Sequence, residues 1–501
     1  MANGGIIGTV NNPTSSTATG VWQQEEQYEA KVTGTWPQKA TFTTKSCRFN
    51  SGSSDSLTRT PSSASNRKTW TWSCWVKRSI LTSGDQSIFN SHTDAQNQLE
   101  LYFNSDDSLY VTNRISNTGA NLRTNRKFQD ASAWCHIVLA VDTTQGTNTN
   151  RMKLYVNGVQ ETSFSEAGYP GQNTDTAVNN TVQHRVGDSN LETFFNGYIA
   201  ESILIDGQAL APTSFGVANS DGVWTPIIYT GTFGTNGFNL QFENSAALGT
   251  DSSPNGNTFT VNNLTSIDQS TDYPEVNFAT LNPLDVSLPS TFTLSNGNLE
   301  NLTLTDTTVS GNHTYGRVFS TIQVASGKWY VEMKWVNTGS AGMVAVTSRS
   351  GVVSSQYAYL GKENEDWRYY HDGTKMNNNS SSSYGNSQAN GDIVGVALDL
   401  DNLKIYFSKN GTWQNSGNPE SGATGTGAAF TLTAPNLTSN GAYKFGIGTQ
   451  GGQNVKGTWN FGSPSYAISS GNADANGYGN FEYAPPSGYY SLNTANLAEF
   501  G

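Results

Sequence analysis

The stretch "GDIVGVALDLDNLKIYFSKNG", residues 391–411, alternates apolar and polar side chains, turns at Asp401-Asn402, alternates again and turns at Asn410-Gly411. Alternation with a period of two is typical of strands with one face on a core, and Asn-Gly is a favoured hairpin turn. The stretch therefore predicts an antiparallel hairpin with a fixed register. Three side chains of its first strand are expected to face the core: Ile393, Val396 and Leu398.

The composition of the whole chain favours many such strands. Charged residues make up only 13% of the 501 residues, and there are 51 glycines together with many Thr, Ser, Asn and Tyr. This composition is typical of short strands joined by tight turns. A chain of this length also exceeds one compact core, which suggests two or three domains. We therefore expect an all-β protein of two or three domains.

Charge and cysteine content argue against several classes of protein. The formal net charge of −12 would repel nucleic acid, and no stretch clusters Lys or Arg with aromatic residues. Cys47, Cys74 and Cys135 match neither a disulfide framework nor a zinc site, so buried thiols are expected, with no metal or cofactor. No signal peptide and no apolar run of ~18 residues is present, which predicts synthesis in the cytoplasm and no membrane insertion.

Residues 1–38 differ from the rest of the chain. The segment "VWQQEEQYEAKVTG", residues 21–34, predicts one short helix with Thr19 as N-cap and Gly34 as its end. A lone helix with so thin an apolar stripe needs a covering partner. We expect a helical anchor that orders against a larger assembly by burying three aromatic side chains, although a frayed terminus is an equal alternative on physical grounds. These side chains are Trp22, Tyr28 and Trp36.

Residues 39–212 contain the first set of strands. In "TWTWSCWVKRS", residues 69–79, alternate positions place Trp70 and Trp72 on one face and Trp75 on the other. The stretch "WCHIVLAVDTTQGTNTNRMKLYVNGVQE", residues 134–161, predicts a hairpin that ends at an Asn-Gly turn. These segments resemble the laminin G-like, concanavalin A-like jelly-roll family, which implies a β-sandwich here.

Residues 213–285 predict a connector of short strands and turns, and residues 286–463 a second sandwich. Within the latter, "SGKWYVEMKW" (326–335), the hairpin at 391–411 and the final "NFG" (460–462) resemble the SPRY family. That resemblance implies another antiparallel sandwich. Residues 464–501 lack a strand pattern, and we expect this tail to pack along the second sandwich.

A group of aromatic and acidic residues in the second sandwich is a candidate glycan-binding site. Sugar rings stack on Trp and Tyr, while carboxylates bind the hydroxyl groups. Alternate aromatic residues are equally what a sandwich strand buries, so a core role is the alternative. The candidate residues are Tyr357, Tyr359, Asp366, Trp367, Tyr369 and Tyr370.

Catalysis and calcium binding find little support in the sequence. The paired carboxylates of glucanases, spaced Glu-x-Asp-x-x-Glu on one strand, do not occur here. The segment Asp251-Ser-Ser-Pro-Asn255 begins like a calcium loop, but no carboxylate closes it, so a turn is expected. We therefore predict that the protein is not an enzyme.

The chain as a whole resembles virion proteins from tailed phages of marine bacteria, on residues 1–38, the connector and the ending "GYYSLNTANL" (488–497). The resemblance implies a tail fibre or similar appendage of the virion, attached through its N-terminus to tail, adaptor or capsid proteins and adsorbing to host cell-surface polysaccharide. A homotrimer is one expected state, although no heptads or collagen-like repeats enforce it. The alternatives are a capsid decoration protein with weak glycan contact and a polysaccharide-degrading enzyme.

Overall fold

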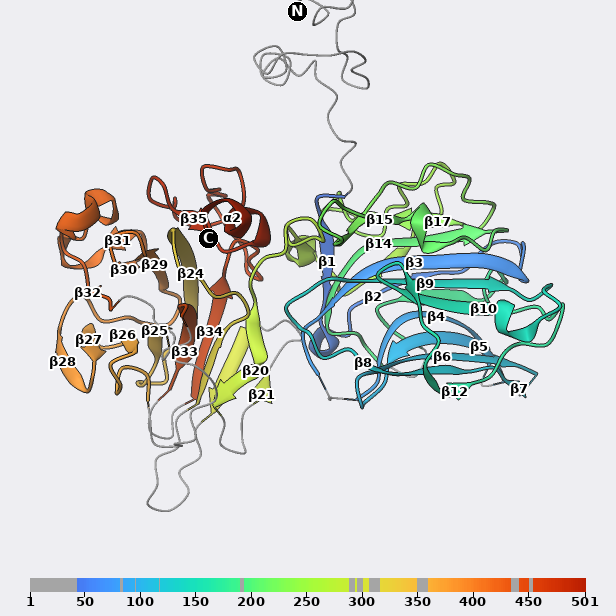
Figure 1. Cartoon of the computed structure of the whole chain (residues 1–501), viewed down its shortest axis with the longest axis horizontal. Helices are drawn as coiled ribbons and strands as arrows, with labels where there is room; N and C mark the ends of the chain where they lie inside the picture. Colours follow the sequence, from blue (N-terminus) through green and yellow to red (C-terminus); the bar gives the residue numbers. More distant parts are fainter. Residues whose placement is uncertain are drawn as a thin grey trace, which may run out of the picture.

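The computed structural model contains two β-sandwiches that lie side by side (Figure 1). It describes residues 43–501 apart from 82–83, 95, 117, 190–192, 288–292, 295–300, 306–315, 349–358, 434–440 and 450–453. The predicted helix at residues 21–34 lies outside these described residues. The all-β, two-sandwich prediction is confirmed for the part of the chain that is described.

The first sandwich packs two antiparallel sheets, which we call sheets 1 and 2. In order, sheet 1 contains β11 (Val159–Gln160), β10 (Met152–Val156), β9 (Cys135–Asp142), β3 (Thr69–Arg78), β14 (Gly197–Asp206), β1 (Ser46–Phe49) and β19 (Gln269–Ser270), and β17 (Phe238–Leu240) also pairs with β14. Sheet 2 contains β12 (Phe164–Ala167), β8 (Leu122–Lys127), β6 (Ser108–Ile115), β5 (Asn97–Phe103), β4 (Gln86–Asp94), β13 (Gln183–Val186), β2 (Ser56–Arg59) and β18 (Thr260–Asn262), and β7 (Thr118–Gly119) pairs with β6.

The core of this sandwich follows the alternation in the sequence. Trp70, Trp72, Cys74 and Val76 of β3 are buried between the sheets, and Trp72 stacks on Phe89 of β4 at 5.2 Å between ring centroids. The other face of β3 points away from this core, and there Trp75 joins a separate cluster. The period-two prediction for residues 69–79 is confirmed.

The predicted connector adds strands to the first sandwich. Its strands β17, β18 and β19 pair with β14, β2 and β1, so they extend both sheets. A small hairpin of β15 (Gly216–Ala218) and β16 (Trp224–Pro226) covers the outer face of sheet 1. There the Trp224 ring stacks on the His136 ring, with 6.1 Å between the ring centroids. Much of residues 213–285 thus belongs to the first sandwich.

The second sandwich packs sheets 3 and 4. Sheet 3 contains, in order, β20 (Leu281–Ser287), β23 (Arg317–Ser320), β33 (Lys444–Gly448), β25 (Met343–Thr347), β26 (Asp366–Tyr370), β27 (Thr374–Asn377) and β28 (Ser380–Ser383). Sheet 4 contains β21 (Thr293–Leu294), β22 (Asn301–Thr305), β34 (Asn454–Asn460), β24 (Lys328–Asn337), β29 (Ile393–Asp399), β30 (Lys404–Lys409) and β31 (Thr412–Trp413), with β32 (Phe430–Thr431) paired to β30.

The hairpin at residues 391–411 forms as predicted, with one correction of its faces. Strands β29 and β30 pair in antiparallel register, from Val394 opposite Lys409 to Asp399 opposite Lys404. In the following turn, Asn410 and Gly411 have φ angles of +48° and +77°. Val394, Val396 and Leu398 point into the core. Ile393, which we expected there, lies outside that cluster. Side chains alternate between the two faces of a strand, so Val394 and Val396 share the inner face and Ile393 lies on the outer one.

The C-terminal tail packs on the second sandwich, as expected. Its β35 (Tyr490–Ser491) adds to β24 in parallel, and α2 (Thr494–Phe500) follows, with the Asn493 side chain accepting from the backbone N–H of Asn496. Phe500 stacks on Tyr490 at 3.7 Å. The remaining short helices are 3-10 turns: η1 (Ser51–Ser53), η2 (Asn148–Asn150), η3 (Pro212–Ser214), η4 (Ser266–Asp268), η5 (Gln414–Ser416) and η6 (Pro419–Thr424).

A polar junction fixes the two sandwiches to each other. The Lys77 ammonium is fully buried and donates to Asp272 Oδ2 at 2.8 Å, to Asn277 Oδ1 at 2.6 Å and to the carbonyl of Phe278 at 2.7 Å. Ala131, from the loop before β9, packs into the core cluster of the second sandwich. Because a buried charge is tolerated only when it is fully paired, these bonds hold the connector against β3.

Candidate functional site

The structure contradicts much of the glycan site predicted in the second sandwich. In β26, Trp367 and Tyr369 point into the core and are 2% and 0% exposed. Asp366, on the other face, is also buried and accepts from Thr347 Oγ1 at 2.7 Å. These three side chains therefore cannot stack on or bind a sugar at the surface. The alternation of aromatic residues reflects burial between two sheets, and Tyr357 lies outside the described residues.

Tyr359 and Tyr370 are half-buried, but they hold an arginine between them. The Arg368 guanidinium lies 5.0 Å from the Tyr359 ring and 4.7 Å from the Tyr370 ring, and it donates to the carbonyl of Leu360 at 3.1 Å. The Tyr359 hydroxyl donates to Asn379 Oδ1 at 2.7 Å. Both rings thus take part in packing the outer face of sheet 3, and nothing here brings them together as a sugar platform.

The predicted docking residues Trp22, Tyr28 and Trp36 lie outside the described residues, so virion docking through them stays a prediction.

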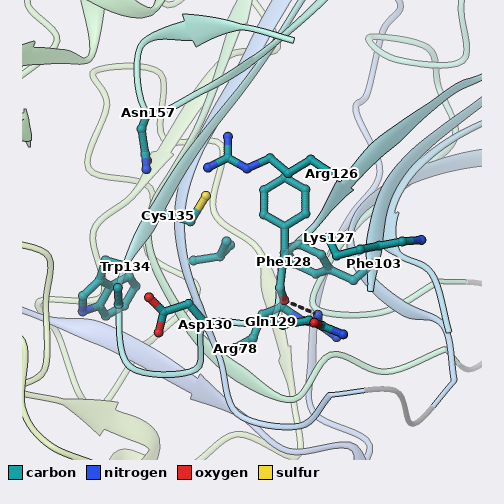
Figure 2. A pocket seen from close by; sticks show the side chains of 12 residues that line it. Arg78, Phe103, Arg126, Lys127, Phe128, Gln129, Asp130, Trp134, Cys135 and Asn157 are labelled. Carbon is teal, nitrogen blue, oxygen red and sulfur yellow. Dashed lines mark hydrogen bonds between the residues drawn. The ribbon is translucent and has the colours of Figure 1, made fainter. Parts of the chain in front are cut away.

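A better-formed candidate lies in the first sandwich, where a pocket of about 140 Å³ opens beside β3, β8 and β9 (Figure 2). An engineered cavity of about 150 Å³ holds one benzene ring, so a volume of this size accepts a single six-membered ring. Four short stretches supply the lining: Val76 and Arg78; Phe103; Arg126, Lys127, Phe128, Gln129, Asp130, Ala133, Trp134 and Cys135; and Asn157.

The inner wall of the pocket is apolar and aromatic. Phe128 lies near the centre of the pocket view, with Trp134 at one side and Phe103 behind (Figure 2). Phe103 and Phe128 meet edge to face at 5.6 Å, and Arg78 lies over Phe103 at 4.4 Å. Arg78 also donates to the carbonyl of Phe128 at 2.7 Å and to Asp107 Oδ1 at 2.9 Å. This network holds the aromatic wall in place.

Polar groups of three kinds surround the opening. The Arg126 guanidinium lies 5.3 Å from the Phe128 ring and donates to Glu161 at 2.9 Å. Asp130, which is exposed, accepts from the backbone N–H of Ser132 at 2.8 Å through Oδ1. Asn157 accepts from the backbone N–H of His136 at 2.8 Å. A cation, a carboxylate and an amide around an aromatic wall can together bind the hydroxyl groups of a stacked ring.

The thiol in this pocket is a weak nucleophile at neutral pH. Burial of the Cys135 sulfur raises its pKa to about 12, so the reactive thiolate is scarce at neutral pH.

The carboxylate of Asp251, in the segment that begins like a calcium loop, stabilises its own turn. It accepts from the backbone N–H groups of Asn239, Ser253 and Asn257. The turn predicted there is confirmed. Among the described residues, no group of His, Cys, Asp or Glu has the arrangement of a metal site.

The sequence could not reveal this pocket because its walls come from separate stretches. Residues 76, 103, 128 and 157 meet only when sheets 1 and 2 are packed. The one local signal was "FQDASAWC", residues 128–135, an interruption between two strands that carries Phe, Asp and Trp together. The aromatic-rich pattern at residues 357–370 indicates a strand, and such a pattern does not point to a site that is built on a loop.

Comparison with known proteins gives a family for each sandwich. Residues 51–213 match the family model of the concanavalin A-like lectin/glucanases superfamily, and residues 328–436 match that of the SPRY domain. The chain therefore contains a concanavalin A-like domain and a SPRY domain. No curated protein matches the chain. In the part of the chain that the structure describes, no helix is long and apolar enough to cross a membrane.

Among solved structures, the SPRY domain of human HERC1 is 18% identical, covering 36% of this chain and 96% of that one, with a TM-score of 0.26. A Bacteroides ovatus protein for which carbohydrate binding has been suggested is 16% identical, covering 46% of this chain and 60% of that one, with a TM-score of 0.29. A pentraxin from Limulus polyphemus is 16% identical, covering 31% of this chain and 71% of that one, with a TM-score of 0.24.

Proposed function

We propose that the protein binds carbohydrate, and that the pocket of Figure 2 holds one sugar residue of a larger glycan. The observation that carries the proposal is the combination of an aromatic wall, formed by the partly accessible Phe128 and Trp134 over the buried Phe103, with the polar groups of Arg126, Asp130 and Asn157 in a ring-sized space. The C–H face of a pyranose would pack on the wall. Its hydroxyl groups would accept from Arg126 and Asn157 and donate to Asp130.

We further propose that this recognition serves a virion appendage, a tail fibre or similar structure, which adsorbs to host cell-surface glycan and does not cleave it. Its support is the resemblance of residues 1–38, the connector and the C-terminal end to phage virion proteins, together with a lectin-like domain suited to a receptor-binding role. The N-terminal segment would attach to tail, adaptor or capsid proteins through Trp22, Tyr28 and Trp36.

The pocket is tested with Ala133→Trp. Ala133 is exposed and lines the opening, so an indole there fills the space without altering the core. We expect glycan binding, measured on a printed panel of bacterial surface glycans, to fall at least tenfold. The same substitution at Ala423, which is exposed and lies in η6 of the second sandwich, is the control. Unchanged binding by the Ala133 variant would refute the pocket as the sugar site.

The virion proposal is tested by deleting residues 1–38. We expect the shortened protein to keep the thermal unfolding profile of the full chain, because residues from 46 onward supply the strands of both sandwiches, and to be absent from purified particles. Incorporation of the shortened protein at the normal level would rule out attachment through this segment. Release of new reducing ends from host polysaccharide would contradict the non-enzymatic proposal.

A further inference from the structure

We infer that a groove between the two modules is a second carbohydrate-binding site, which accepts a stretch of several sugar residues. The groove has a volume of about 520 Å³ and lies between residues 266–271 of the connector and residues 463–468 of the tail. We call it the inter-module groove. Its volume is several times that of the pocket in Figure 2, so it offers room for a chain where the pocket offers room for one ring.

The chemistry of the lining favours a hydroxyl-rich, uncharged ligand. Ser266, Gln269, Thr271 and Asn480 present hydroxyl and amide groups, which both donate and accept. Among the described residues that line the groove, Lys45 alone carries a charge. A polyanion would find one partner there and would be repelled by a chain of net charge −12, whereas hydroxyl groups can bond along both walls.

Apolar side chains lie among these polar groups. Ile267 is 40% exposed, which is unusual for an isoleucine, and Pro464, Tyr466 and Ile468 lie on the opposite wall. Small apolar surfaces flanked by amides and hydroxyls match the two faces of a sugar, whose C–H groups need apolar contact and whose hydroxyl groups need hydrogen bonds.

One buried arginine holds both walls of the groove. Arg48, on β1, is 1% exposed. Its guanidinium donates to the carbonyl of Ile267 at 3.2 Å on one wall and to the carbonyl of Pro464 at 3.0 Å on the other. The hydroxyl groups of Ser270 and Ser463 lie 2.6 Å apart, and Thr271 donates to the carbonyl of Gly462 at 3.1 Å.

These bonds fix the width of the groove before any ligand arrives. A site whose walls are already in place loses little conformational entropy on binding, so even modest contacts yield measurable affinity. The lining residues come from Lys45, the connector and the region after β34, so the groove lies outside the two regions that match family models, residues 51–213 and 328–436.

The test uses the full chain and a panel of bacterial surface glycans of one to six sugar residues. Ala467 is exposed and lines the groove, so Ala467→Trp should block it. We expect a loss of at least tenfold in affinity for glycans of three or more residues and no change for single sugars. Ile267→Ser, which removes exposed apolar surface but leaves the backbone carbonyl for Arg48, should weaken the same long glycans by a smaller factor.

Two controls separate this site from the pocket of Figure 2. Ala133→Trp should weaken the binding of single sugars and leave unchanged the extra affinity that longer glycans gain, whereas Ala423→Trp, at an exposed position of η6 that lines neither site, should change neither. The inference is overturned if Ala467→Trp affects all glycan lengths equally, has no effect, or if no glycan of any length binds. If Ala467→Trp loses long-glycan binding and Ala133→Trp has no effect, the groove would be supported as a carbohydrate site and the pocket would be rejected as one.

Discussion

At the scale of single residues, the buried carboxyl groups determine how stability depends on pH. Glu332, on β24, is 0% exposed and accepts from the backbone N–H groups of Glu482 and Tyr483 at 3.0 and 2.8 Å. Desolvation outweighs these bonds and raises its pKa to about 7, from the usual 4.5. Burial likewise raises the pKa of Glu201 to about 7.

The sign of the effect follows from the raised pKa. The folded protein keeps the Glu332 proton when the unfolded chain has lost it, so this contribution to stability is present below pH 4.5 and is lost as the pH rises to 7. Relative to Glu332→Gln, the wild type should lose at most about 1.4 kcal/mol of unfolding free energy per pH unit across that range. Urea unfolding at pH 5, 6, 7 and 8 measures the difference.

The exposed Ser220, which has no group that titrates in this pH range, provides the control for this prediction. Ser220→Ala should change the unfolding free energy by the same amount at all four pH values. A difference between wild type and Glu332→Gln that does not vary with pH would show that the carboxyl group is ionised equally in both states.

At the scale of elements, the pocket wall and the junction share the same two segments. On β3, Val76 and Arg78 face the pocket while Lys77, between them, points into the junction. In the loop at 128–134, Trp134 lines the pocket and donates to Asp272 at 2.9 Å, and the carbonyl of Ser132 accepts from Asn277 at 2.6 Å. The connector therefore helps to position the pocket.

This arrangement predicts that Asn277→Ala loosens the pocket. The loop loses its bond at Ser132 and Lys77 loses one of three acceptors, so Cys135 should react several-fold faster with iodoacetamide. Cys47 and Cys74 are fully buried and should stay unmodified in the native protein, which mass spectrometry can check. Asn262→Ala, on sheet 2, is the matched control. An unchanged rate at Cys135 would mean that the junction does not hold the loop.

Sequence reasoning succeeded where a pattern is local. The hairpin at 391–411 and the faces of β3 depend on alternation and turn residues within a few positions, so they could be predicted. The same alternation could not say whether Trp367 and Tyr369 face a core or a ligand, because both uses need aromatic residues on one face. The short helix α2 was missed, although Asn493 is a suitable N-cap, because seven residues give too little periodicity.

At the scale of the whole molecule, the connector determines the architecture. A reading by composition divides the chain at 213 and 285, yet residues 238–240, 260–262 and 269–270 pair with strands of the first sandwich. Two of these pairings join residues about 200 positions apart, and such pairing depends on tertiary packing that the local sequence pattern does not reveal. The inter-module groove and the junction both follow from this pairing.

The Arg48 guanidinium on β1 joins both walls of the inter-module groove, and β3 of the same sheet lines the pocket, so two proposed sites would be carried by one sheet. A polymer long enough to reach from one site to the other would meet the second at a high effective concentration once the first is filled. Its avidity could then exceed either single affinity by orders of magnitude, while shorter fragments of the same polymer would compete poorly. Two such sites on one sheet would therefore select for polymer length as well as for sugar identity.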